Sequence, residues 1–246
     1  MNELAAVLAD GITTPPLPRK SSAVYHALRR AILLHRVTPG QMLLEQQIAS
    51  TMGCSQGTVR EALLRLEQDG LVERRGYRGT CVSDTSEAEA ALMARVRIEI
   101  ESRGARLAAE RASDADFLHL GQILTRMQEA EERHDGYAMS ELDRSFHLAI
   151  LHLAGLSALA PILTRCSLHV HRFTYGRGPC GTTPDNRRGL PSGTELHREL
   201  LRALASGDGE VAAVAMREHI LRVIRAWAPA LLARVLEKEG EPATLR

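Results

Sequence analysis

One stretch, from Glu45 to Gly70, limits what this chain can fold into more than any other. It reads EQQIASTMGCSQGTVREALLRLEQDG, which predicts two short helices joined by a tight turn. Gly53 breaks the first helix because glycine accepts a positive φ, and Ser55 can cap the second. In the second helix, apolar residues recur at helical spacing and form a buried face: Val59, Ala62, Leu63 and Leu66. The opposite face is polar and cationic, which suits the major groove of DNA.

The segments on either side complete a small winged domain. Apolar residues at helical spacing predict a first helix over residues 19–36, and a turn signal follows at residues 38–40. After Gly70, the segment LVERRGYRGTCV predicts a strand, a basic loop that contains glycine, and a return strand. This hairpin, or wing, carries three arginines that are placed to touch phosphate or the minor groove: Arg74, Arg75 and Arg78.

The distribution of charge agrees with a DNA-binding role for this segment. Residues 19–82 contain 10 Lys and Arg against 5 Asp and Glu, whereas residues 83–246 contain 21 against 23. Aromatic residues make up only 3% of the chain, which argues against a stacking surface for single-stranded nucleic acid. Winged helices also serve as protein-interaction modules, but the local positive charge and the wing arginines favour DNA.

The rest of the chain has a different character. It shows almost no strand signal and predicts helices near 88–112, 114–135, 137–155, 157–175, 194–206 and 208–237. Residues 176–193, rich in Gly, Pro and Arg, predict a long loop. The expected fold is therefore mainly α, with an N-terminal winged helix-turn-helix followed by an all-α helical bundle. The expected divisions are a flexible arm at 1–18, the winged domain at 19–82, a linker at 83–87, the helical domain at 88–237 and a tail at 238–246.

Two further observations narrow the class of protein. The four cysteines have no C-x-x-C spacing, so we expect neither a zinc knuckle nor a disulfide framework. The N-terminus lacks the basic start and long apolar run of a secretory signal, and no apolar stretch is long enough to cross a bilayer. We therefore expect a cytoplasmic protein with no membrane partner.

Asp143 and His147 stand four residues apart in a predicted helix, so they share one face, and the flanking apolar residues put that face near the core. His197 and His219 follow on later helices. One carboxylate and three imidazoles are a suitable ligand set for a divalent ion such as Zn²⁺ or Ni²⁺. The alternative is a surface i,i+4 pair beside two ordinary half-buried histidines. The remaining histidines match no motif and are interpreted as surface or packing residues, among them His119, His152, His169 and His171.

Several segments together resemble a known family. PGQMLLEQQIA, VREALLRLEQDGLVE and the RGT-x-V of the wing are similar to the winged helix-turn-helix of GntR-type transcriptional regulators. The helical part resembles the FCD effector domain of the FadR-like branch. The metal motif of that domain is an Asp-x3-His on one helix and two histidines on later helices. The resemblance therefore implies a metal site formed by four residues: Asp143, His147, His197 and His219.

The same resemblance implies a set of DNA-contacting positions in the helix-turn-helix and the wing. They are Gln46, Ser55, Gln56, Gly57, Thr58, Arg60, Arg74, Arg75, Tyr77, Arg78 and Gly79. Arg60 matches a DNA-contacting arginine of the family. Gln56, however, stands where the family usually has an arginine, and Gln46 stands where some relatives carry one. We therefore expect a flatter salt dependence than is usual for the family, with Gln56 as a candidate contact to adenine.

Arg97 matches a position where many FCD domains carry an inward arginine beside the metal. A guanidinium there suits a bidentate clamp on a small carboxylate. Since Glu101 lies four residues further on, a helix-surface ion pair is the alternative.

The resemblance implies a homodimeric transcriptional regulator that binds an operator of double-stranded DNA. Its affinity for the operator would be controlled by an organic-acid effector at the metal site, and by analogy it would act as a repressor. Two alternatives stay open at this point. A metal-dependent hydrolytic enzyme could use the same Asp/His₃ set, although the chain has no H-E-x-x-H motif. A regulator with a purely structural metal is the other.

Overall fold

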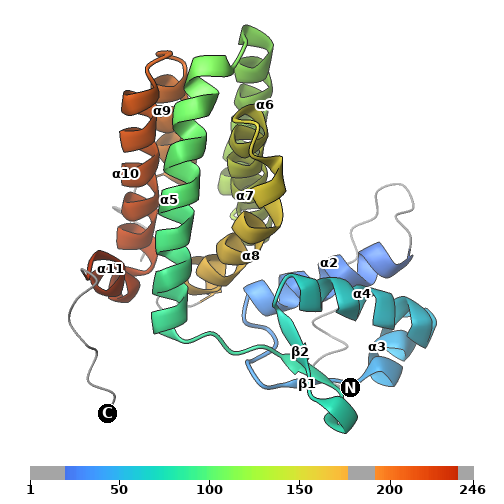
Figure 1. Ribbon diagram of the computed structural model, residues 1–246. Coiled ribbons are helices and arrows are strands. Elements are labelled where there is room, and N and C mark those ends of the chain that lie inside the picture. Colours follow the sequence, from blue (N-terminus) through green and yellow to red (C-terminus); the bar gives the residue numbers. More distant parts are fainter. Residues whose placement is uncertain (1–19, 177–191, 238–246) are drawn as a thin grey trace.

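The computed structural model describes residues 20–176 and 192–237. Figure 1 shows a small winged domain beside one end of a taller bundle of helices. A single linker joins them, between strand β3 (Thr80–Val82) and helix α5 (Glu87–Arg111). The predicted arm at 1–18, most of the predicted loop at 176–193 and the predicted tail at 238–246 lie outside the described residues.

The winged domain is built from helices α2 (Lys20–Leu33), α3 (Glu45–Met52) and α4 (Gln56–Gln68) around one apolar core. The predicted turn between α3 and α4 is confirmed. Gly53 has a left-handed φ of 58°, and its N–H bonds back to the carbonyl of Ala49. Ser55 caps α4, because its Oγ accepts the backbone N–H of Thr58 at 3.2 Å. These local devices set the angle at which α4 leaves the turn and presents its polar face.

The predicted wing forms, with one strand more than expected. Strand β3 lies in the middle of a three-stranded antiparallel sheet, between β2 (Val72–Arg74) and the short β1 (Met42–Leu43). A 3₁₀ turn, η1 (Gly76–Arg78), forms the tip between β2 and β3. The sequence analysis did not predict β1, because two residues are too few to show an alternating pattern.

The first helix is shorter than the predicted 19–36 and ends at Leu33. His35 has a positive φ of 53°, which is incompatible with a continuing right-handed helix. The N–H groups of Arg36 and Val37 both point back to the carbonyl of Ala31, at 2.8 and 3.3 Å. The chain therefore turns three residues earlier than the apolar pattern suggested, and His35 lies in the connection that faces the helical domain.

The helical domain confirms the mainly α prediction. Its elements are α5, α6 (Asp114–Glu132), α7 (Gly136–Leu153), η2 (Ser157–Leu159), α8 (Ala160–His171), η3 (Arg172–Gly176), α9 (Gly193–Leu204), α10 (Gly209–Trp227) and α11 (Pro229–Leu236). Helix α5 presents alanines to the core, which lets α10 pack closely along it. Phe146 on α7 and Met127 on α6 are fully buried in the same core. The described helices include none that is long and apolar enough to cross a membrane.

Two helix predictions need correction. The predicted helix at 208–237 is divided into α10 and α11 at Ala228, whose φ of −141° is not helical. Pro229 explains the break, because its ring excludes the helical conformation from the residue before it. The predicted helix at 157–175 is three segments: the 3₁₀ turn η2, the α-helix α8 and the π-helical turn η3. A π turn holds one extra residue, and such turns occur often at functional sites.

Candidate metal centre and DNA-binding surface

The structure brings the four predicted metal ligands together in the core of the helical domain. Asp143 and His147 come from α7, His197 from α9 and His219 from α10. All four are buried, with at most 4% of their surface exposed. One ligand atom of each lies within 4.8 Å of the others. The idea of a surface Asp–His pair with two half-buried histidines is therefore wrong.

Neighbouring groups orient two of the imidazoles so that Nε2 points into the cluster. The Nδ1–H of His197 donates to the backbone carbonyl of Gly193 at 2.7 Å. Nδ1 of His147 lies against the carboxylate of Glu101 in a short contact. The opposite ring nitrogens then face Asp143: Nε2 of His197 lies 3.1 Å from Oδ1, and Nε2 of His147 lies 3.8 Å from it. Fixing one imidazole nitrogen by a hydrogen bond in this way is how proteins present the other one to a metal.

The protonation states of the cluster also suit a cation. Burial alone would raise the pKa of Asp143, but the facing His171 and His147 hold it well below its ordinary value. Burial, reinforced by the neighbouring His197 and His147, holds the pKa of His219 well below its ordinary value. An ionised carboxylate and a neutral imidazole are the forms that coordinate metal ions.

The buried side-chain atoms that form no hydrogen bond among the described residues include three ring nitrogens of the cluster, although Oδ1 of Asp143 lies near the first two: Nε2 of His147, Nε2 of His197 and Nδ1 of His219. An unsatisfied buried polar atom costs about 1–3 kcal/mol, and native structures rarely keep several together. A cation bound between these nitrogens and Asp143 would satisfy all of them. The donor set of three nitrogens and one carboxylate fits a divalent ion such as Zn²⁺ or Ni²⁺.

Arg97 does point inward, so the idea of a helix-surface ion pair is wrong, although the pair itself exists. Its Nε donates to Oε1 of Glu101 at 2.7 Å, and both residues are at most 4% exposed. Arg97 lines a small internal cavity together with Asp143, His171 and Thr174. The cavity volume is about 10 Å³, enough for roughly one water molecule and not for an organic acid.

Two histidines that the sequence analysis assigned to the surface or to packing have a more specific place. His171, the last residue of α8, lies 2.9 Å through Nε2 from Oδ2 of Asp143. His169 is buried between the two domains, where Nδ1 lies 2.6 Å from Oγ1 of Thr85. Neither stands at a motif spacing from its partner, so no sequence signal could have identified them. His119 and His152 are exposed, as expected.

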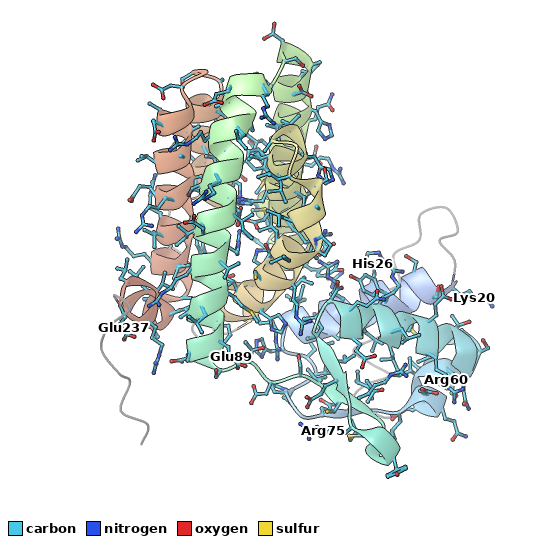
Figure 2. All side chains as sticks on the ribbon, viewed as in Figure 1. Lys20, His26, Arg60, Arg75, Glu89 and Glu237 are labelled. Carbon is cyan, nitrogen blue, oxygen red and sulfur yellow. The ribbon has the colours of Figure 1, made fainter. Side chains whose placement is uncertain are left out.

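The expected DNA-contacting residues occupy α3, the start of α4 and the wing. Apart from the partly buried Thr58 and Arg78, whose side chain lies outside the description, all of them are exposed. Tyr77 at the wing tip is fully exposed. Figure 2 shows Arg60 and Arg75 on the part of the winged domain that points away from the bundle. The Oγ of Ser55 caps the N-terminus of α4. Gln56 and Gly57 are the first two residues of that helix, and their surfaces are exposed.

Carboxylates that the sequence analysis missed lie beside three of these cations. The pairs are Arg60 with Glu45 at 2.6 Å, Arg74 with Glu67 at 3.3 Å, and Arg75 with Glu73. Glu73 occupies both Nε and Nη2 of its arginine, whereas Glu45 contacts only Nε of Arg60. Exposed ion pairs are weak, so a phosphate group can displace them.

An exposed, polar helix-turn-helix on a winged domain, joined to a helical domain with a buried polar cluster, defines a DNA-binding transcriptional regulator with a separate regulatory domain. Residues 20–82 match the family described as bacterial regulatory proteins, gntR family, and residues 92–222 match the FCD domain. The chain belongs to the GntR family of transcriptional regulators, with an FCD domain as its effector domain. The family is one of regulators and not of enzymes, which excludes the hydrolytic alternative.

Individual proteins agree with this assignment. The chain is 27% identical over 208 residues to YdfH, an uncharacterized HTH-type transcriptional regulator of Escherichia coli, covering 85% of this chain and 89% of that one. It is also 26% identical over 208 residues to the HTH-type transcriptional repressor RspR of E. coli K12, again covering 85% of this chain and 89% of that one. Among solved structures, E. coli McbR/YncC has the same fold, with a TM-score of 0.70 and 23% identity over 89% of this chain and 99% of that one.

Proposed function

We propose that this protein is a repressor whose affinity for its operator is set by a divalent metal ion and a small carboxylate bound in the helical domain. The single observation that carries the proposal is the buried set of Asp143, His147, His197 and His219, whose ligand atoms lie within 4.8 Å of one another and include ring nitrogens that form no hydrogen bond among the described residues. Zn²⁺ and Ni²⁺ fit this set best. A bound cation would supply positive charge that attracts an anionic effector.

Arg97 supports the assignment of a carboxylate as the effector. It lines the same cavity as Asp143 and His219, and its guanidinium is held there by Glu101. A guanidinium beside a metal ion is suited to grip a carboxylate that also reaches the metal. Because the cavity is too small for such a ligand, binding requires its walls to move. Ligand binding then favours a different arrangement of the helices, which any change in DNA affinity requires.

On the DNA side we propose direct reading of bases by Gln56 and by Arg60, whereas Arg74 and Arg75 contact phosphate. One winged helix-turn-helix covers only a few base pairs, so useful specificity requires two copies on two half-sites. We therefore propose a homodimer. The name of the E. coli relative RspR supports repression as the direction of control. The proposed domains are residues 19–82 for DNA binding and 88–237 for effector binding and dimerisation.

Elemental analysis combined with DNA binding tests the proposal. The purified protein should contain close to one equivalent of a divalent metal, and the His147→Ala variant should contain much less. A gel shift with the upstream region of the protein's own gene should give a complex whose affinity changes when a chelator removes the metal. A metal that raises the melting temperature but leaves DNA affinity unchanged under all conditions would identify a purely structural ion and refute the regulatory role.

A further inference from the structure

The winged domain rests on the bundle through buried polar contacts at the end of α8. Arg172, only 3% exposed, donates from Nη2 to the backbone carbonyl of Ser83 at 3.0 Å and from Nη1 to Oγ1 of Thr85 at 3.3 Å. Its own carbonyl accepts from Nε2 of His35 at 2.9 Å. His169 contacts the same Thr85 hydroxyl. The turn of the helical domain from His169 to Arg172 therefore forms hydrogen bonds both with the linker and with the connection that follows α2.

The same turn reaches the metal centre. His171 immediately precedes Arg172, and its Nε2 lies 2.9 Å from Oδ2 of Asp143. The other oxygen of Asp143, Oδ1, faces the imidazoles of His197 and His147. Asp143 thus stands between the cluster on one side and the end of α8 on the other. A ligand that moves the carboxylate of Asp143 therefore changes the hydrogen bond between Asp143 and His171.

Further hydrogen bonds connect the linker with helix α4. The hydroxyl of Ser83 donates to the carbonyl of Gly70 at 2.6 Å, and its N–H donates to the carbonyl of Leu71 at 3.0 Å. The N–H of Leu71 in turn bonds to the carbonyl of Leu66 in the last turn of α4 at 2.9 Å. A continuous series of hydrogen-bonded or covalently linked residues therefore connects Asp143 with α4. Its polar side chains His171, Arg172 and Ser83 are buried.

The element between the two sites is a π turn that reaches both of them. Arg172 begins the π turn η3, and Thr174 of that turn lines the cavity beside Asp143. Since the cavity of about 10 Å³ holds no more than a water molecule, a ligand must displace one of its walls.

We propose that the His171–Arg172 turn couples the metal centre to the DNA-binding domain. His171 is a positioning residue for Asp143, and Arg172 converts movement of η3 into movement of the linker and of α4. The inference rests on the proposed function and assigns its regulation to named residues. Coupling of this kind requires an element whose arrangement is biased by both sites, and η3 contacts both, through Thr174 at the cavity and Arg172 at the linker.

The test compares wild-type protein with Arg172→Lys and Thr85→Val, using Zn²⁺ alone as the probe. Lysine keeps the buried charge but cannot hold Ser83 and Thr85 together. Valine keeps the shape of Thr85 and removes the hydroxyl. Fluorescence anisotropy gives the Kd for a duplex that wild-type protein selects from a random library, first with chelator and then with Zn²⁺. The ratio of these two Kd values is the response, and competition with a chromophoric chelator gives the affinity for Zn²⁺.

We expect a wild-type response of about fivefold or more, within the usual range for allosteric coupling. Both variants should bind Zn²⁺ within about threefold of wild type. Arg172→Lys should show a response close to one, and Thr85→Val, which keeps the bond from Arg172 to Ser83, should show a clearly reduced response. Thr85→Val carries the test if circular dichroism shows that Arg172→Lys does not fold. The matched control is Tyr137→Phe, which removes another contact between the domains, the one to His26 at 3.4 Å, and should keep the response.

Three results would overturn the inference, and they differ from one another. A wild-type response of one refutes the regulatory role of the metal and the coupling with it. A full response in both variants refutes the route through Arg172 but leaves the proposed function intact. An equal loss in Tyr137→Phe shows that the response depends on domain contact in general and not on this turn.

Discussion

Replacing Glu101 by glutamine tests whether this buried carboxylate stabilises Arg97 and orients His147 at the metal centre. The carboxylate of Glu101 is 2% exposed and lies between two groups: Nε of Arg97 at 2.7 Å and Nδ1 of His147. Glutamine keeps the size of the side chain and removes its charge. The buried guanidinium then loses its nearest counter-charge, and His147 loses the group that fixes its ring.

The structure gives the size of the effect. Burial alone would raise the pKa of Glu101, but Arg97 and His147 hold it at about 2, against an ordinary value of 4.5. At 1.36 kcal/mol per pKa unit this corresponds to about 3 kcal/mol of stability at neutral pH, comparable with the cost of breaking a buried pair. Because the pKa is lowered on folding, the contribution is complete above pH 4.5 and is lost as the pH falls towards 2. The affinity for the metal should also fall by about 10- to 100-fold, as when other carboxylates behind a metal-bound histidine are removed.

Urea denaturation of chelator-treated protein provides the measurement. Trp227 is the only tryptophan of the chain and ends α10, so its fluorescence reports the unfolding of the helical domain. The matched control is Glu99→Gln on the same helix, where the pair with Arg103 is exposed and the change should stay within about 0.5 kcal/mol. A loss below about 1 kcal/mol in Glu101→Gln, or Zn²⁺ affinity equal to that of wild type, would refute the role assigned to this carboxylate.

Three further predictions concern the DNA surface and the contact between domains. Glu73→Gln frees Arg75 for phosphate, so binding to random-sequence DNA should tighten and its salt dependence should steepen by about one phosphate contact, measured by anisotropy against salt concentration; unchanged affinity would show that the pair does not compete with DNA. Gln56→Ala should change the sequences selected from a random library, whereas Arg74→Ala should weaken all of them alike; an unchanged preference would exclude Gln56 as a base contact. Burial and the nearby Arg172 lower the pKa of His169 to about 4. The free energy of unfolding should therefore fall as the pH drops from 6.5 towards 4, and His169→Gln should make that fall smaller. An equal fall in the variant would assign the pH dependence to other groups.

The winged domain could be predicted from the sequence because its signals are local. Gly53 and Ser55 fix the turn between the two helices through their own backbone and side chain, and the structure places them as expected. The end of the first helix was missed because His35 adopts its positive φ in a connection that packs against Arg172, far away in the chain. The break before Pro229 did carry a local signal, which the helical pattern on both sides concealed.

The metal centre could be predicted only in part from its residues. Asp143 and His147 share a helix face by spacing alone, but His197 and His219 come from helices whose packing no local pattern reveals. The two histidines were candidates by residue type, and the family motif strengthened their assignment. His171 belongs to no such motif, and it comes near Asp143 only because α7 and α8 pack together at this level. What the sequence could not reveal is therefore the connection between the centre and the rest of the molecule.

The charges around the cavity give an independent reason to expect a cation. Two buried carboxylates, Asp143 and Glu101, face one buried guanidinium, that of Arg97. The pKa values of His171 and His219 are lowered chiefly by burial, which favours their neutral forms. In the metal-binding form, with its imidazoles neutral, the described part of the cluster has an excess negative charge in a setting where an uncompensated charge is costly. A divalent ion reverses this balance and leaves an excess positive charge beside Arg97, so binding of the metal itself prepares the site to attract a carboxylate.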